Sequence, residues 1–242
     1  GGGLTTITFV PGNKQVGFKI TGYFKEEPTS IIFFPRKTYL TTMNANTELD
    51  QNLIVVDSNY ALFDSTLGGG YIISNNGNQA ISRFDTYLTI YDQDGTTCEV
   101  LTSEGNHIFS GETTGISSGP IFLPPACNYG DFELFLLPLE TNNLELINNP
   151  LKAENATYIS SANPMVTLNI SNSYSKSISE TIVYVLLFNE VGEIINGGFA
   201  FPDPIPGNGS VDVEVYLSPM GEEEPAYIEA YPVFTTWTSI GD

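Results

Sequence analysis

The sequence predicts an all-β protein built from two tandem β-sandwiches, which follow an amino-terminal segment of additional strands. Short runs of β-branched and aromatic residues recur along the chain, and clusters of Gly, Pro, Asn, Asp and Ser separate them, as expected of strands and turns. No stretch of 11 residues has helical periodicity. The second half of the chain also repeats the pattern of the first at a spacing of 97 residues.

The expected strands are short, and turn-forming residues separate them. Residues 211–215 alternate apolar and acidic side chains strictly, which indicates a strand with one buried face and one wet face. Turn-forming residues recur about every 8 to 12 positions, a spacing typical of sandwiches rather than of a parallel α/β sheet. In chain order, strands are expected at residues 4–10, 16–24, 30–34, 53–56, 71–73, 87–91, 132–137, 166–170, 182–188, 211–217 and 227–233.

An internal repeat divides most of the chain into two units. A shift of 97 positions without a gap places Ile-Ser-Asn at residues 73–75 on the same tripeptide at residues 170–172, and it places Gly95 on Gly192. At both glycines a strand is followed by an Asp or Asn turn. The turns are therefore expected at the same corner of each unit. The predicted organisation is a strand segment at residues 1–48, one sandwich at 49–141 and a second at 147–242.

The same strand and turn segments resemble a known family. Residues 88–92 (Leu-Thr-Ile-Tyr-Asp) with Gly95, and residues 185–189 (Val-Leu-Leu-Phe-Asn) with Gly192, are similar to the motif that names the FxLYD domains, small immunoglobulin-like sandwiches of prokaryotic cell-surface proteins. Neither segment has the leading Phe, and Asn189 stands where the motif has Asp. The resemblance implies immunoglobulin-like sandwiches and an extracellular location, and it implies no catalytic residue.

The acidic composition restricts the classes of partner. Eight Lys and Arg residues stand against 28 Asp and Glu residues, which gives a formal net charge of −20. Such a chain repels phosphate backbones and anionic lipid surfaces, so nucleic-acid binding is not expected. No apolar run approaches about 18 residues, so no membrane span is predicted either.

The charge is divided unevenly along the chain. Through Asp50 the net charge is +1, from five basic and four acidic residues, and the remainder carries −21, from three basic and 24 acidic residues. The strands expected in residues 1–48 have no counterpart in the repeat and need a sheet edge. They can pack on their own chain or add to a neighbouring copy, as in donor-strand complementation. In the second case Leu4, Ile7 and Phe9 belong to the assembly strand.

The two cysteines predict a disulfide between Cys98 and Cys127, with two reduced core thiols as the alternative. Three N-glycosylation sequons, at Asn155, Asn169 and Asn208, agree with an extracellular chain. Both features favour an oxidising compartment.

No catalytic, cofactor-binding or metal-binding set is predicted. His107 is the only histidine and is expected to be a surface or turn residue. Asp92 and Asp94 begin a calcium-like loop, but no later acidic ligand follows, so a hairpin turn is predicted. The three glycines at residues 68–70 are expected to form a bulge or flexible turn. Trp237 has no pattern on either side and is not assigned to a ligand site.

These observations favour an extracellular, non-enzymatic structural protein. The leading hypothesis is a self-assembling subunit of a surface filament or other polymeric surface assembly, linked by amino-terminal donor-strand addition. The alternative is a monomeric adhesin or binding module whose ligand is a carbohydrate or a protein.

Overall fold

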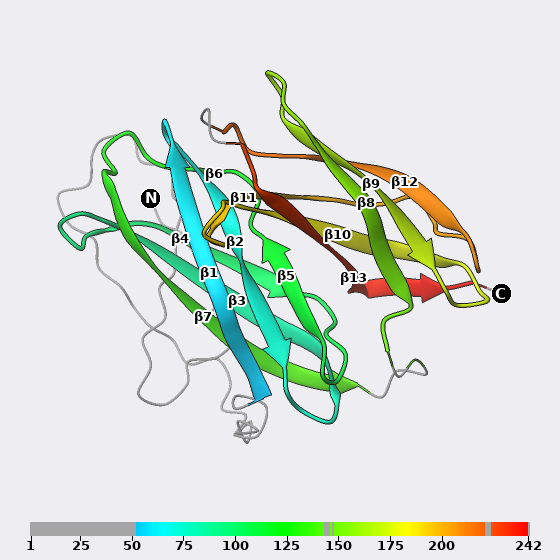
Figure 1. Ribbon diagram of the computed structural model, residues 1–242. Helices are drawn as coiled ribbons and strands as arrows, with labels where there is room; N and C mark the ends of the chain where they lie inside the picture. The colour runs from blue at the N-terminus through cyan, green and yellow to red at the C-terminus, as the bar shows by residue number, and fades with distance from the viewer. Residues whose placement is uncertain (1–51, 143–145, 147, 221–223, 242) are drawn as a thin grey trace, which may run out of the picture.

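The computed structural model describes residues 52–142, 146, 148–220 and 224–241 of the 242-residue chain. These residues form antiparallel strands, so the all-β prediction is confirmed (Figure 1). Within them, no helix is long and apolar enough to cross a membrane. The strands are β1 (Leu53–Phe63), β2 (Thr66–Asn75), β3 (Ala80–Asp92), β4 (Thr97–Gly105), β5 (Thr113–Ser117), β6 (Ile121–Phe122), β7 (Tyr129–Asn142), β8 (Leu151–Ile159), β9 (Met165–Asn172), β10 (Ile178–Phe188), β11 (Ile194–Ala200), β12 (Ser210–Tyr216) and β13 (Tyr227–Ile240).

The strands form two units with the same topology. The first unit, β1 to β7, has one sheet in the order β1-β2-β5, with β6 attached to β2, and another in the order β4-β3-β7. The second unit, β8 to β13, has sheets in the orders β8-β9-β12 and β11-β10-β13. Each strand of the first unit except β6 thus has a counterpart in the same place in the second. The predicted boundaries, 49–141 and 147–242, stay predictions, and the segment 1–48 lies outside the described residues.

Each unit has a buried asparagine at the equivalent position, and the two asparagines make the same pattern of hydrogen bonds within their own units. The Asn75 Nδ2 donates to the carbonyl oxygens of Gln79, Ile108 and Phe109, at 2.8, 3.2 and 3.1 Å. The Asn172 Nδ2, 97 residues later, donates to those of Lys176, Ile205 and Pro206, at 2.9, 3.3 and 3.2 Å. Because a buried carbonyl left without a donor costs about 1–3 kcal/mol, each asparagine fixes the loop that crosses its sandwich.

The two glycine turns also correspond. Gly95 and Gly192 have φ angles of 78° and 86°, in the left-handed region that glycine tolerates best. Before them, Asp92 and Asn189 each accept hydrogen bonds from two backbone amides of their own turn. One turn joins β3 to β4 and the other joins β10 to β11, which are counterparts, as the repeat predicts.

The side chains of β10 show how the four sheets stack. Its odd-numbered apolar residues, including Val185, lie in the core of the second unit, together with residues of β8, β9 and β12. Its even-numbered residues Ile182 and Tyr184 instead pack with residues of the β1-β2-β5 sheet. Since β10 is buried on both faces, the β1-β2-β5 and β11-β10-β13 sheets form the two inner layers, and the other two sheets lie outside them.

Glycines allow the two inner sheets to approach closely. A Cβ atom at Gly70 would come within 2.7 Å of the Leu186 side chain, and one at Gly115 within 2.4 Å of the Tyr231 ring. The glycines at residues 68–70 are therefore not a bulge or flexible turn, as the sequence suggested, but lie inside β2. A Cβ atom at Gly68 would meet Asn196 and Ser218 of the second unit, so the lack of side chains at Gly68 and Gly70 lets this sheet face contact that unit.

Candidate functional site

The predicted site residues fall into three groups. Leu4, Ile7 and Phe9 lie outside the described residues. Cys98 and Cys127 form the predicted disulfide, with a Cα–Cα distance of 5.6 Å, against the core of the first unit. The three sequon asparagines do not share one environment.

Two of the three sequon asparagines are exposed, and the side chain of the third is hydrogen-bonded to a neighbouring strand. Asn155 and Asn208 are exposed and have positive φ angles, 56° and 52°. Asn169 is half-buried on β9, and its Nδ2 donates to the Asp212 Oδ1 at 2.9 Å. Glycosylation at all three stays a prediction, and the geometry favours Asn155 and Asn208 because their amides make no such cross-strand bond.

The first candidate site is the outer edge of β1. Among the described residues, β1 pairs with β2 on one side and has no strand on the other. Val56 is the extra residue of a bulge in the β1-β2 register. An edge strand presents unpaired backbone N–H and C=O groups, and this one also carries exposed apolar side chains. These are Ile54, Val55, Val56, Leu62 and Phe63, which are 41, 40, 57, 45 and 37% exposed.

Contacts from both units fix the β1 edge in place. The Tyr60 hydroxyl, in the core of the first unit, lies 2.8 Å from the Ser118 Oγ, and its ring packs edge-on against Phe132 at 4.9 Å. The Asn59 Nδ2 donates to the Ile194 carbonyl oxygen of the second unit at 2.8 Å. The edge is therefore a rigid element and needs no reordering to accept another strand.

Acidic residues far outnumber basic ones in the part of the chain that follows Asp50. After Asp50 the chain has three basic residues against 24 acidic ones. Arg83 is 3.1 Å from Glu104 and 3.7 Å from Glu140, and Lys152 is 3.0 Å from Glu154. The body built from these residues therefore has a strongly negative field, which attracts a segment of positive charge.

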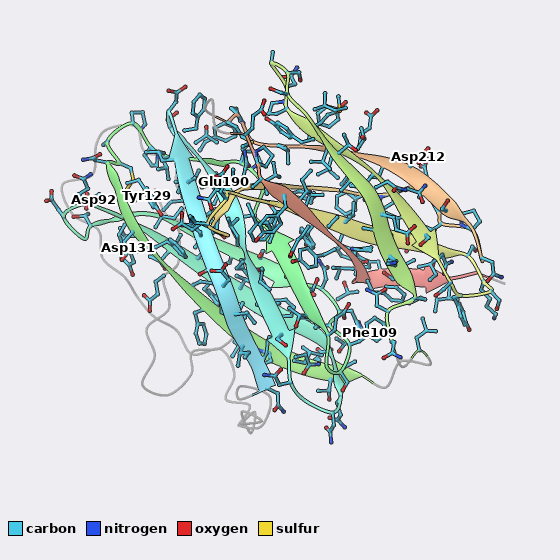
Figure 2. All side chains as sticks on the ribbon, viewed as in Figure 1. Asp92, Phe109, Tyr129, Asp131, Glu190 and Asp212 are labelled. Carbon is cyan, nitrogen blue, oxygen red and sulfur yellow. A yellow bond between two sulfur atoms is a disulfide. The ribbon has the colours of Figure 1, made fainter. Side chains whose placement is uncertain are left out.

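The second candidate site lies at one end of the contact between the units, where the β4–β5 loop of the first unit enters the second. Phe109, which is labelled in Figure 2, is 2% exposed and belongs to the core of the second unit. Its ring packs edge-on against that of Phe234, at a centroid distance of 5.5 Å. The backbone N–H of His107 donates to the Phe234 carbonyl oxygen at 2.8 Å. This loop therefore locks the units together.

His107 is buried, which corrects the expectation of a surface or turn residue. It is 6% exposed, its ring lies 5.8 Å from that of Phe109, and its Nε2 has no hydrogen-bond partner among the described residues. Burial lowers the pKa of His107 to about 4, because the charged imidazolium would lose its hydration. The sequence did not reveal this because the burial comes from the other unit.

A cavity of about 390 Å³ adjoins the same loop, with Glu112 in its wall. The Glu112 Oε2 accepts a hydrogen bond from the Phe109 N–H at 2.7 Å, and its Oε1 accepts one from the Asn149 Nδ2 at 3.0 Å. Asn149 also donates to the Pro232 carbonyl oxygen at 2.8 Å. Burial raises the pKa of Glu112. Because both oxygens bind backbone or amide groups, this carboxylate is a structural bridge between the units.

Acidification is expected to destabilise the protein through His107. The folded pKa of about 4 lies below the ordinary value of 6.5, so the stabilisation is complete above pH 6.5 and declines as pH falls toward 4. Between pH 7.5 and 4.5, wild type should lose about 2 to 3 kcal/mol more of its unfolding free energy than His107→Gln. Urea denaturation at both pH values measures this. Both proteins contain Glu112, so its titration affects them equally and does not contribute to the difference. Equal losses in the two proteins would show that His107 titrates normally.

The calcium-like segment is a turn. The Asp92 Oδ1 accepts hydrogen bonds from the backbone N–H groups of Asp94 and Thr96, at 3.0 and 2.7 Å. The predicted hairpin turn is thus confirmed. In the described part of the chain, no three His, Cys, Asp or Glu residues are grouped so that they could hold a metal ion.

Comparisons with known proteins assign no family. No protein-family model matches the chain, and no curated protein matches it. Among solved structures, it is similar to the C-terminal globular domain of the oligosaccharyltransferase from Pyrococcus abyssi, with a TM-score of 0.26 and 11% identity over 79% of this chain and 48% of that one. It is also similar to red sea bream transglutaminase, with a TM-score of 0.24 and 9% identity over 76% and 30%. The chain thus spans less than half the length of either structure.

Proposed function

We propose that this protein is an extracellular structural subunit that polymerises by donor-strand addition. Residues 4–10 of one copy add to the open edge of β1 in the next copy. The observation that carries the proposal is the edge itself, eleven residues long and flanked by exposed apolar side chains. No other described strand covers this edge, and an apolar edge of this kind is normally covered or blunted in a monomer.

The chemistry of residues 4–10 suits that edge. The sequence Leu-Thr-Thr-Ile-Thr-Phe-Val is rich in β-branched residues, contains no charge, and has no proline to interrupt a ladder. Backbone hydrogen bonds to β1 supply the affinity, and the side chains of Ile7 and Phe9 cover the apolar residues beside the edge.

Charge supports pairing between copies. The segment through Asp50 carries +1 and the remainder carries −21, so the amino-terminal segment of one copy is attracted to the body of another. A head-to-tail contact of this kind produces an open polymer unless its rotation closes a ring.

The joined units and the disulfide agree with an extracellular structural role. The inner sheets are packed across glycines, and Phe109 of the first unit packs in the core of the second. The disulfide between Cys98 and Cys127 agrees with an oxidising compartment.

Deletion of residues 1–10 and substitution at the edge test the proposal. We expect the full chain to form polymers and the deletion variant to be a folded monomer, and electron microscopy and sedimentation velocity would measure both. The double variant Val56→Lys/Leu62→Lys should also stay monomeric, because lysines on an exposed edge oppose strand addition.

A control is Val191→Lys, which places one lysine away from the edge, on a side chain that is 79% exposed in the β10–β11 turn. This variant should polymerise as wild type does. If the deletion variant still polymerises, or if the full-length protein stays monomeric at high concentration, donor-strand addition is refuted and the monomeric binding module takes its place.

A further inference from the structure

A second cavity, of about 390 Å³, lies on the second unit and is lined by exposed aromatic and acidic side chains. Trp237 and Phe201 are 74% and 68% exposed, and both line this cavity with Glu180 and Asp203. Large aromatic rings left this exposed lose the favourable free energy of burial, so a site that gathers two of them beside carboxylates is a candidate for ligand binding.

An enlarged β-bulge presents Trp237. Thr181 pairs with Phe234 and Ser179 with Ser239, so four residues of β13 lie opposite the single residue Glu180. Bulges commonly redirect a side chain toward a binding site. Here the redirected side chain is the only tryptophan of the chain.

The bulge is held rigidly by its own hydroxyl groups. The Oγ1 atoms of Thr235 and Thr238 lie 2.7 and 3.0 Å from the Glu180 carbonyl oxygen, to which they donate. The backbone N–H of Trp237 donates to the Thr235 Oγ1 at 3.1 Å. Glu180 has a φ of 57°, an uncommon conformation for a residue other than glycine, and one that tends to cluster at ligand sites.

The opposite wall is also preorganised. Pro202 and Pro204 flank Asp203, and their rings restrict the backbone on both sides of its carboxylate. Phe201 packs edge-on against Phe199 at a ring distance of 5.9 Å. In the wall between them, the buried Thr181 Oγ1 has no hydrogen-bond partner among the described residues. A buried hydroxyl without a partner calls for a bound water or ligand group.

Among the described residues, the first unit lacks the four-residue bulge at the equivalent position. At the equivalent position, Arg83 pairs with Glu140 and Phe84 with Pro138, so the register shifts without a four-residue bulge. Arg83 there forms ion pairs with Glu104 and Glu140. The repeat has therefore diverged at this corner, and the second unit alone combines the bulge with the tryptophan.

We propose that this cavity binds an uncharged saccharide. One apolar face of a pyranose ring stacks on the Trp237 indole, and the ring hydroxyls donate hydrogen bonds to the carboxylates of Glu180 and Asp203. A sugar presents both an apolar face and a rim of hydroxyl donors, which matches an aromatic platform edged by acceptors. The same carboxylates repel uronic acids and sialic acids. This site does not depend on polymerisation.

Intrinsic fluorescence tests the proposal directly, because Trp237 is the only tryptophan of the chain and all indole emission therefore comes from it. Cellohexaose, mannohexaose and the hexamer of N-acetylglucosamine are the neutral probes. At least one should shift the emission to shorter wavelength in a saturable way. Hexagalacturonate, which is anionic, should not. The expected result is the same for full-length protein and for the variant that lacks residues 1–10.

Variants measured by calorimetry assign the binding to these residues. Trp237→Ala should weaken binding at least about tenfold, and Asp203→Asn about three- to tenfold. The control is Tyr216→Ala, which removes an aromatic side chain that is 60% exposed on β12 of the same unit, and it should bind as wild type does. The proposal is overturned if no neutral hexasaccharide binds, if Trp237→Ala leaves the affinity unchanged, or if pentalysine alone binds, which would identify a cation site.

Discussion

Replacing Phe109 with alanine is expected to lower the free energy of unfolding by about 3–5 kcal/mol, the range for deleting a buried phenylalanine. The side chain is 2% exposed and lies among the core residues of the second unit, although it belongs to the first. Its loss leaves a cavity next to Phe234 and removes the side chain through which the β4–β5 loop packs in the second unit. Urea denaturation at pH 7.5 measures the change.

The matched control is Phe122→Ala, because Phe122 is 71% exposed on β6. The same atoms are deleted there, and the expected loss is within about 0.5 kcal/mol, as for most surface substitutions. A Phe109→Ala variant that unfolds at the same urea concentration as Phe122→Ala would contradict the packing described for this loop. If Phe109→Ala alone showed a second unfolding transition, the Phe109 contact would be what makes the two units of wild type unfold together.

Local sequence patterns predicted the fold class and the equivalence of the two turns. Glycine at positions 95 and 192 follows an Asp or Asn that caps the turn with its own side chain, and these are short-range effects that a few residues determine. Asn75 and Asn172 were visible as repeated residues. Their role in satisfying loop carbonyls 33 and 34 residues away was not, because that role depends on contacts distant in sequence.

The strands that the sequence did not predict are β4, β5, β8 and β11, which are rich in polar or small residues, and β6, which has only two residues. β4 and β8 contain several Thr, Ser, Glu and Asn residues, and β11 contains two adjacent glycines. Their pairing partners stabilise them more than their own propensity does. β2 was recognised only at residues 71–73, because its glycines are explained by a neighbouring sheet that the sequence alone does not place.

The candidate sites were predicted to different degrees. Residues 53–56 were expected to form a strand, but that β1 extends to Phe63 and lies at an edge follows from the sheet order. Trp237 carried no signal in sequence, because its exposure comes from a bulge defined by the partner strand β10. Repeat alignment offers one clue to this site: Glu180 falls on Arg83, a reversal of charge at equivalent positions.

Removal of the disulfide is expected to lower the free energy of unfolding by about 3–4 kcal/mol, from the entropy of a loop that spans 29 positions. The bond lies against the core beside Tyr129, whose hydroxyl reaches the Tyr60 carbonyl oxygen of β1 at 3.4 Å. The double variant Cys98→Ala/Cys127→Ala should therefore be less stable and should also polymerise more weakly, since the β1 edge is less firmly held. Urea denaturation and sedimentation measure the two effects.

Reductant should lower the stability of wild type toward that of the variant and leave the variant unchanged. An insensitive wild type would mean that the bond contributes nothing to stability, and full polymerisation by the double variant would separate the bond from the assembly edge.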